Sequence, residues 1–322
     1  MKSIIQGNTA VFGSVSAVIA VFCFSINDVA IKFISNDYAL HLVVLIRSLV
    51  GLTVLFLFII PFSGGLPTLR TNRLGLHLLR GFCVVFANIT FFLGLAALPL
   101  AEGVAIFFIS PLLITVFSVL FLKETVGPRR WAAVVIGLIG VIVILRPGSA
   151  SFQTASLLPL LAAFGYATLH MLTRYIGKTE SAASMSFYIQ VTFLIICLAF
   201  GLIIGDGKFS GGGDPSLEFL FRAWSWPSSN HYLIMILIGA GSAFGGFFIS
   251  QAYRISEAAV VAPFEYIALP IAIFWGVVIF GDWPDKTTLA GIALILGSGL
   301  YIIWRETILK GAETLGTPRY RR

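Results

Sequence analysis

Several ionisable side chains of this sequence lie inside segments that are otherwise apolar enough for lipid. Asp28 and Lys32 lie in the run AVFCFSINDVAIKFI (residues 20–34), and Glu265 lies in APFEYIALP (residues 262–270). Such groups are costly in hydrocarbon, so they usually face the interior of a helix bundle and mark the paths of substrates, ions or protons. The chemistry that these residues favour is therefore the binding and release of charged solutes.

Glu265 is the strongest candidate for a site residue. Pro263 and Pro270 flank it, and proline disturbs a helix because it lacks the backbone N–H and leaves carbonyl groups free. A carboxylate at this depth is suited to bind a cationic group of a substrate or to carry a coupling proton. The structural alternative is a hydrogen bond to a neighbouring helix that fixes packing.

The remaining charged candidates lie in the first three apolar segments. Asp28 and Lys32 are four residues apart, so they share a helix face and can pair, although Lys32 is also close enough to the helix end to extend to the membrane interface. Arg47 is suited to bind an anionic group or to neutralise Asp28 or Glu265. Arg80 is expected to reach the interface.

Polar and aromatic side chains supply further candidates for lining a cavity. Asn88 can orient a substrate or hold helices together. Aromatic rings can line a cavity for a flat substrate, although most rings in such segments only pack. The aromatic candidates are Tyr166, Tyr266 and Trp275, with Phe24 and Tyr188 as further possibilities.

Motifs for catalysis, metal binding and nucleotide hydrolysis are missing from the sequence. There is no H-E-x-x-H pattern and no P-loop, and the four histidines show no metal-ligand spacing. The three cysteines lie in apolar runs and form no disulfide framework. We therefore expect no catalytic residue, no metal and no cofactor. An intramembrane enzyme or a channel-like protein is the alternative to a carrier.

The composition places these residues in a membrane protein. Of the 322 residues, 58% are hydrophobic and only 11% are charged, whereas soluble domains average about 45–50% and about 25%. The sequence predicts an all-α integral membrane protein with ten transmembrane helices. The predicted spans are 11–34, 40–61, 76–97, 101–122, 130–146, 156–176, 184–205, 231–253, 257–280 and 286–305. The loop 206–230 is expected to be irregular, with aromatic anchors.

The basic residues predict the orientation. With both termini in the cytoplasm, fourteen Lys and Arg residues fall in inner segments and four in outer loops, as the positive-inside rule requires. The net charge of +7 is thus a topology signal, and nucleic acid is not expected as a partner. The expected location is the inner (plasma) membrane.

The chain also shows an internal duplication. Residues 20–34 align with residues 162–176. This alignment pairs Phe24 with Tyr166, Asp28 with His170 and Lys32 with Arg174. An acid in one half and a histidine in the other can form a proton-sensitive pair, although a single histidine more often packs.

Two halves of five spans each must sit in opposite orientations, because five is odd. The sequence thus predicts two inverted five-helix repeats, residues 1–150 and residues 151–322, the second with a basic cytoplasmic tail. In this scheme Glu124 and Asp282 correspond and lie on opposite sides of the membrane. The glycine-containing segments 137–145 and 291–300 allow close helix packing, within the chain or in a homodimer.

At this point the motifs resemble the drug/metabolite transporter superfamily, and within it the EamA-type transporters. The similarity rests on FSINDVAIKFIS, RSLVG, LPLAEGVAIFFISPLLITVFSVLFLKET, GPRRWAAVVIGLIGVIVILRP and SEAAVVAPFEYIALPIAIFWGVVIFGDWPDKTTLAGIALILGSGLYII, and it covers nearly the whole chain. One departure is GDW (residues 281–283), where the family pattern prefers Gly-Glu, but Asp282 keeps the charge.

The resemblance implies a secondary transporter of a small polar organic metabolite, working by alternating access with protons or exchange as the driving force. Family members carry amino acids, nucleotide-like metabolites, vitamins and drugs. SINDVAIKFIS is most similar to a bacterial subgroup that includes S-adenosylmethionine and riboflavin uptake carriers. The expected partners are a small-molecule substrate and the lipid bilayer.

Overall fold

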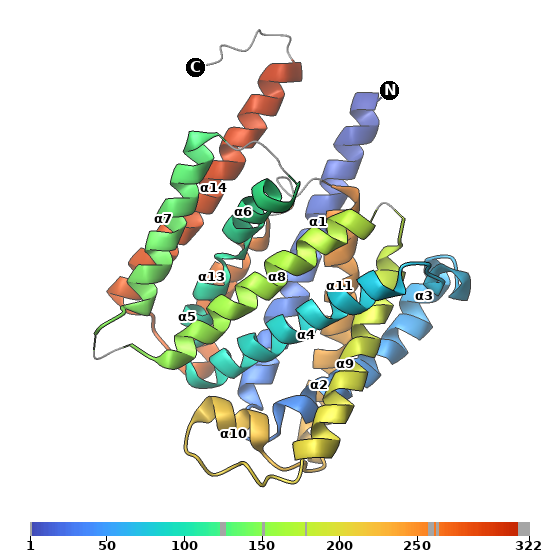
Figure 1. Ribbon diagram of the computed structural model, residues 1–322, viewed down its shortest axis with the longest axis vertical. Coiled ribbons are helices and arrows are strands. Elements are labelled where there is room, and N and C mark those ends of the chain that lie inside the picture. Colours follow the sequence, from blue (N-terminus) through green and yellow to red (C-terminus); the bar gives the residue numbers. More distant parts are fainter. Residues whose placement is uncertain are drawn as a thin grey trace.

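A computed structural model describes residues 2–122, 127–149, 152–177, 179–256, 261 and 264–314. Within these residues the protein is a bundle of helices without a β-strand (Figure 1). Runs of more than 20 apolar residues explain this architecture, because a helix satisfies every backbone hydrogen bond within its own segment and can therefore lie in lipid.

The long helices are connected by short turns. The described helices are α1 (Lys2–Phe33), α2 (Leu40–Val54), α3 (Ile60–Phe62), α4 (Leu74–Ala97), α5 (Leu100–Phe107), α6 (Ser110–Leu122), α7 (Pro128–Leu145), α8 (Leu157–Ile176), α9 (Ala182–Ile204), α10 (Pro215–Phe221), α11 (Tyr232–Ile255), α13 (Ala268–Trp275) and α14 (Lys286–Thr314). A π-helical turn joins α2 to α3 (Leu55–Ile59), and another follows α13 (Gly276–Phe280).

Seven helical segments in the described part of the chain are long and apolar enough to cross a membrane. They are Val11–Phe33, Leu40–Phe62, Leu74–Ala97, Leu100–Phe121, Thr154–Ile176, Ala182–Ile204 and Ser229–Ile255. Three shorter apolar helices, at Trp131–Leu145, Ala268–Phe280 and Lys286–Tyr301, overlap the other predicted spans. The chain is thus a multi-pass membrane protein.

Two of the predicted spans are interrupted near their middle. The span predicted at 101–122 is divided into α5 and α6 by a turn at residues 108–109, and Pro111 lies in the first turn of α6. Residues 266–267 form a second turn, directly before α13, whose third residue is Pro270. Proline explains both positions, because it cannot donate to the preceding turn. Pro263 lies outside the described residues.

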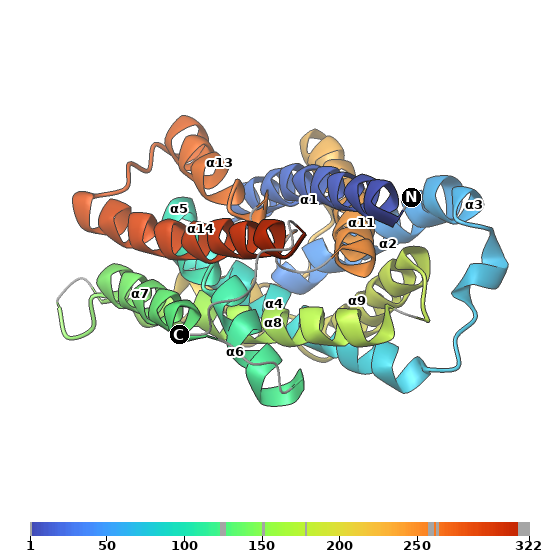
Figure 2. The ribbon, with the colours of Figure 1, turned by 90° about the horizontal axis from the view of Figure 1, so that it is seen from above.

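Helices from the two halves of the sequence pack against each other. The most extensive contacts join α1 to α11, α4 to α8 and α7 to α14. Figure 2 shows α7 and α14 side by side on one flank of the bundle.

Glycine permits the close approach of α7 and α14. A Cβ added at Gly140 would lie 2.9 Å from the carbonyl oxygen of Gly291, and one at Gly291 would lie 2.8 Å from that of Gly140. The segments 137–145 and 291–300 therefore pack within the chain, as one of the two sequence-based alternatives proposed.

The loop 206–230 is more ordered than the sequence suggested. It contains α10, which Asp214 caps by accepting a hydrogen bond from the backbone N–H of Leu217 at 3.0 Å. Trp224 does not serve as an interface anchor, because its ring packs on Gly201 of α9, whereas Trp226 is exposed as expected. The expectation of an irregular loop missed the Asp-Pro signal for a helix start at Asp214 and Pro215.

Candidate functional site

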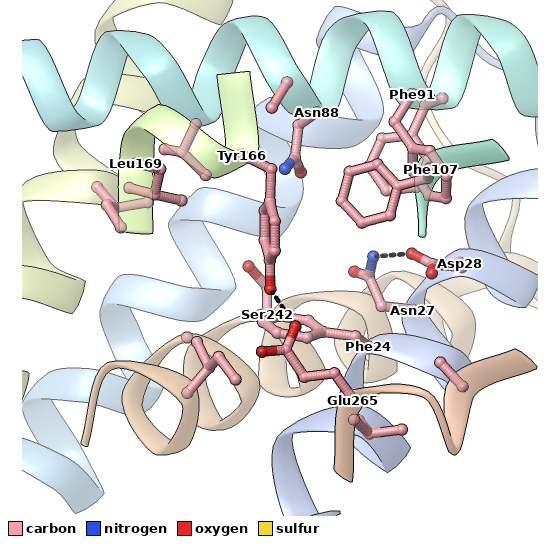
Figure 3. Close-up of a pocket in the computed structure, with 18 of the residues that line it drawn as sticks. Phe24, Asn27, Asp28, Asn88, Phe91, Phe107, Tyr166, Leu169, Ser242 and Glu265 are labelled. Carbon is pink, nitrogen blue, oxygen red and sulfur yellow. Dashed lines mark hydrogen bonds between the residues drawn. The ribbon is translucent and has the colours of Figure 1, made fainter. Parts of the chain in front are cut away.

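A cavity of about 150 Å³ lies in the middle of the bundle. Helices α1, α2, α4, α5, α8, α9, α11 and α13 contribute to its wall, whereas none of its lining residues comes from the described residues of α7 or α14. Its charged and larger polar lining residues are Asn27, Asp28, Arg47, Arg80, Asn88, Tyr166, His170, Gln190 and Glu265. Figure 3 shows part of this wall. Eight of the twelve residues singled out in the sequence thus surround one space, namely Phe24, Asp28, Arg47, Arg80, Asn88, Tyr166, His170 and Glu265.

Glu265 lies beside the turn that precedes α13, where the interrupted helix brings its carboxyl group to the cavity. The hydroxyl of Tyr166 on α8 donates to Oε2 at 3.1 Å, and the hydroxyl of Tyr253 on α11 donates to Oε1. Figure 3 shows Tyr166 extending across the cavity toward Glu265. Only 5% of Glu265 is exposed, and no cation lies within ion-pair distance of it in the described part of the chain. The site thus holds a buried carboxyl group bonded only to neutral phenols.

His170 completes this cluster on the α8 side. Its ring lies between Tyr166 and Tyr253, with centroid distances of 4.2 Å to each. Both ring nitrogens are buried and have no hydrogen-bond partner among the described residues. The sequence paired His170 with Asp28 by the internal duplication; both line the cavity, but His170 contacts the tyrosines that hold Glu265 and makes no hydrogen bond to Asp28.

Asp28 faces the same cavity from α1. Its only hydrogen bond in the described structure is a long one, 3.4 Å, from the side-chain amide of its neighbour Asn27 (Figure 3). The possible pairing with Lys32 does not occur. Lys32 instead donates to the backbone carbonyls of Leu95 and Leu98, at 2.7 Å and 2.6 Å. It thus binds the carbonyl end of α4, where the helix dipole favours a cation.

Arg47 on α2 and Asn88 on α4 meet at the wall of the cavity. Nη1 of Arg47 donates to Oδ1 of Asn88 at 2.9 Å. The guanidinium also lies over the ring of Phe193, with its central carbon 4.4 Å from the centroid, which is a favourable cation–π distance. No carboxylate among the described residues pairs directly with Arg47.

Arg80 is placed differently from the sequence-based expectation. It does not extend to the interface, because it is 98% buried at the centre of the bundle. Its guanidinium donates to Thr173 Oγ1 at 2.7 Å, to the Met185 carbonyl at 2.9 Å and to Ser250 Oγ at 3.1 Å. Arg80 therefore connects α4 to α8, α9 and α11. The sequence alone did not indicate that these three helices would each supply it with a hydrogen-bond acceptor.

Aromatic rings form much of the remaining wall. Phe24, Phe91, Phe107 and Phe108 line the cavity with Tyr166. Of these, Phe91, Phe107 and Phe108 were not singled out in the sequence, because nothing in an apolar run marks which rings face inward.

Three aromatic candidates do not line this cavity. Tyr266 is buried against Gly299 of α14 and lies near Phe108. Trp275 lines a separate apolar groove between α1 and α13 with Phe22 and Pro270. Tyr188 donates to the carbonyl of Leu69.

Two polar contacts join helix starts at opposite ends of the bundle, and the sequence reading missed both. The first, which we term the α4–α9 latch, joins His77 Nε2 to Glu180 Oε2 at 3.2 Å. Thr71 also donates to Glu180 Oε1, at 2.9 Å. The second, the α2–α11 latch, joins Tyr38 Oη to His231 Nδ1 at 2.9 Å.

The two latches occupy corresponding positions in the two halves of the chain. His77 is near the start of α4 and His231 directly precedes α11, whereas Glu180 and Tyr38 lie two residues before α9 and α2. The sequence did contain a signal: a polar residue lies two positions before the second span of each half, and a histidine lies at the start of the third span. Only the contacts between these residues in the folded bundle show what the pattern means.

Chemically, the wall of this cavity is suited to a solute that carries charge and a flat ring. Two carboxyl groups and two guanidinium groups face it, and phenylalanine and tyrosine rings supply surfaces for stacking. No group of three or more His, Cys, Asp or Glu side chains suited to a metal ion occurs in the described ranges.

Comparisons with known proteins agree with this picture. The model of the EamA-like transporter family matches residues 11–146 and 153–304. The S-adenosylmethionine uptake transporter of Rickettsia prowazekii is 29% identical over 282 residues, which are 88% of this chain and 89% of that protein. The riboflavin transporter of Brucella anthropi is 32% identical over 243 residues, 76% of this chain and 81% of that protein. A crystal structure with 18% sequence identity has the same fold, with a TM-score of 0.63 over 89% of this chain and 94% of that one.

Proposed function

We propose that this chain, which belongs to the EamA-like transporter family, is a secondary transporter that moves a small organic cation with a flat ring. S-adenosylmethionine is the first candidate, because relatives at 29% identity are named as its uptake transporters. Its adenine ring and its sulfonium charge match the two kinds of surface in the cavity, aromatic rings and carboxyl groups.

The observation that carries this proposal is the carboxyl group of Glu265. It is buried in the wall of the cavity, and tyrosine hydroxyls are its only hydrogen-bond partners in the described structure. An intramembrane carboxylate without a counter-charge is costly and marks a place where a cation or a proton binds. Asp28 adds a second carboxyl group to the wall of the cavity, also without a direct ion pair in the described structure. Riboflavin, which is uncharged, gains less from these groups than a cation does.

Glu265 also offers a means of coupling. A carboxyl group that binds either the substrate cation or a proton, but not both, exchanges one for the other during each cycle. Tyr166 and Tyr253 hold both carboxyl oxygens in place, so the group keeps its position when it is empty. Movement of substrate in one direction would then accompany movement of a proton in the other.

Alternating access fits the two latches and the size of the cavity. The latches close opposite ends of the bundle, and each joins a helix of residues 1–150 to a segment of residues 151–322. The cavity of about 150 Å³ is smaller than the roughly 300–1,000 Å³ of ligand pockets. Helices must therefore move apart before a nucleoside-sized molecule enters, and opening one latch at a time achieves this.

An inverted repeat would explain why the two ends resemble each other. In such a repeat α1 corresponds to α8 and α11 to α4, so the α1–α11 contact corresponds to the α8–α4 contact. These are the two most extensive helix contacts in the described structure. Glu124, whose position relative to Asp282 would test this scheme, lies outside the described residues.

The proposed location is the bacterial inner membrane with both chain ends in the cytoplasm. The positive-inside bias supports this orientation, and α1 begins on the side of the bundle where α14 ends (Figure 1).

Uptake by purified protein in proteoliposomes tests the proposal. We expect saturable uptake of labelled S-adenosylmethionine that is faster when the vesicle interior is acidic. Glu265→Gln should lower uptake at least tenfold and abolish the effect of the pH gradient. The matched control is Glu218→Gln, a partly exposed acid on α10 outside the cavity, which should leave uptake unchanged.

Three outcomes would contradict the proposal. Uptake that does not saturate would favour a channel, and chemical conversion of the substrate in detergent would favour an enzyme. A Glu265→Gln variant that keeps its response to the pH gradient would remove Glu265 from the coupling step.

A further inference from the structure

A carboxylate and a guanidinium face the central cavity from consecutive helices without touching. Asp28 of α1 and Arg47 of α2 both line the cavity. No ion pair within 4.0 Å forms between them in the described structure. Two opposite charges in such a setting would gain free energy by direct contact, so a separated pair leaves both groups able to bind something placed between them.

Arg47 has hydrogen-bonding capacity that the protein does not use. A guanidinium carries five N–H donors, and only Nη1 of Arg47 has a hydrogen-bond partner, Asn88 Oδ1. Nε and Nη2 are buried and unpaired among the described residues, and the side chain is 98% buried. A planar fork of unpaired donors suits the two oxygens of a carboxylate. The side-chain amide nitrogen of Asn88, which also lines the cavity, can supply one further donor.

The α1 side offers acceptors instead of donors. Asp28 has a single long hydrogen bond, from Asn27 Nδ2. The Oδ1 atom of Asn27 is buried and without a partner in the described ranges. A carboxylate and an amide oxygen on adjacent residues suit an ammonium group, which has three donors and no acceptor.

We propose that Asp28, Asn27, Arg47 and Asn88 form a subsite for the α-amino acid head group of the substrate. The ammonium group binds at Asp28 and Asn27, and the carboxylate binds at Arg47 and Asn88. The inference rests on the proposed function and narrows it, because it restricts the substrate to amino acid derivatives. Each unpaired group described above then has a partner of the opposite kind.

Arg80 provides a comparison, because it is an arginine of the same bundle whose hydrogen bonds all go to the protein. All three of its guanidine nitrogens have protein partners on three other helices. Arg47 binds one partner and leaves two nitrogens unused. A purely structural role would not explain that difference between two arginines that line the same cavity.

Competition against uptake of labelled S-adenosylmethionine in proteoliposomes tests the subsite. The probes are S-adenosylmethionine and its decarboxylated analogue, which keeps the ring, the sulfonium and the ammonium groups but lacks the carboxylate. For the unmodified protein we expect decarboxylated S-adenosylmethionine to bind roughly 10–100-fold more weakly, because charge-assisted hydrogen bonds to Arg47 are lost.

Variants separate the two ends of the subsite. Arg47→Gln should weaken binding of S-adenosylmethionine by roughly 10–100-fold and leave binding of the decarboxylated analogue within about twofold. Asp28→Asn should weaken binding of both probes. Arg47→Lys, which keeps the charge but not the fork, should recover part of the preference for the carboxylate. Arg146→Gln, at a partly exposed arginine outside the cavity, is the matched control and should change the affinity for neither probe.

Equal affinity of the unmodified protein for both probes would overturn the subsite while leaving the proposed transport function in place. Uptake of the decarboxylated analogue without uptake of S-adenosylmethionine would do the same. If neither probe is bound or transported, the proposed function fails as well. Should Arg47→Gln not fold, as judged by its melting temperature, the comparison of the two probes on the unmodified protein alone decides.

Discussion

The α4–α9 latch gives the most direct test of how the bundle opens. His77 is 1% exposed and Glu180 is 8% exposed, so their contact is largely shielded from water. In Glu180→Gln the amide oxygen can still accept from Thr71, but the charge that attracts the His77 ring at 3.2 Å is gone. The closed arrangement is thereby weakened while the volume of the side chain is preserved.

The size of the effect follows from the loss of the carboxylate charge, which weakens both the ion contact with His77 and the hydrogen bond from Thr71. A hydrogen bond to a charged group contributes about 1.5–3 kcal/mol, and about 1.4 kcal/mol corresponds to a factor of ten in an equilibrium. If the latch forms only when this end is closed, Glu180→Gln shifts the balance between closed and open forms by about 10–100-fold toward open.

Thiol accessibility measures this shift. Ser186 lines the cavity near this end, so Ser186→Cys, in a background in which Cys23, Cys83 and Cys197 are replaced, reports entry of a water-soluble maleimide. We expect labelling to be about 10–100-fold faster in Glu180→Gln, and unchanged in the matched control Glu218→Gln. Equal labelling rates with and without Glu180→Gln, in proteins of equal melting temperature, would refute the latch.

Three further predictions concern the stability of the bundle in detergent. Arg80→Lys cannot make the three bonds of the guanidinium, so a loss of about 2–3 kcal/mol should lower the melting temperature by roughly 4–10 °C; an unchanged melting temperature would show that these bonds do not hold the helices together. Gly140→Val should separate α7 from α14 and lower the melting temperature, whereas Gly297→Ala on α14, where an added Cβ meets nothing within 4 Å, should not; equal effects would exclude close packing as the cause. Arg146 holds the pKa of Asp285 below its ordinary value by hydrogen bonding, so the pair stabilises the fold above the ordinary pKa of an aspartate and loses that contribution as the pH falls through the lowered value. Asp285→Asn should therefore reduce the drop in melting temperature between pH 5 and pH 2 (about the range of that titration), and an equal drop in both proteins would show that Asp285 is not involved.

The sequence by itself determined the membrane class, the family and the approximate positions of the helices. Apolar runs of about 20 residues have few ways to satisfy their backbone in lipid, so composition alone predicts helices there. The family expected from the motifs is confirmed by the match to the EamA-like model. The buried acids and Arg47 were identifiable because a charge in an apolar run is costly wherever the helix is placed.

Only the tertiary structure decided which of these groups meet. Arg80 and Lys32 both looked able to reach the interface. The structure instead places Arg80 among three other helices and Lys32 at the carbonyl end of α4. Tyr166 and Tyr266 looked equivalent, yet only Tyr166 reaches Glu265 and the cavity. Spacing along one helix fixes which face a residue occupies, but the neighbour on that face comes from a segment far away in the chain. That neighbour depends on how the helices rotate and cross, which local sequence patterns do not encode.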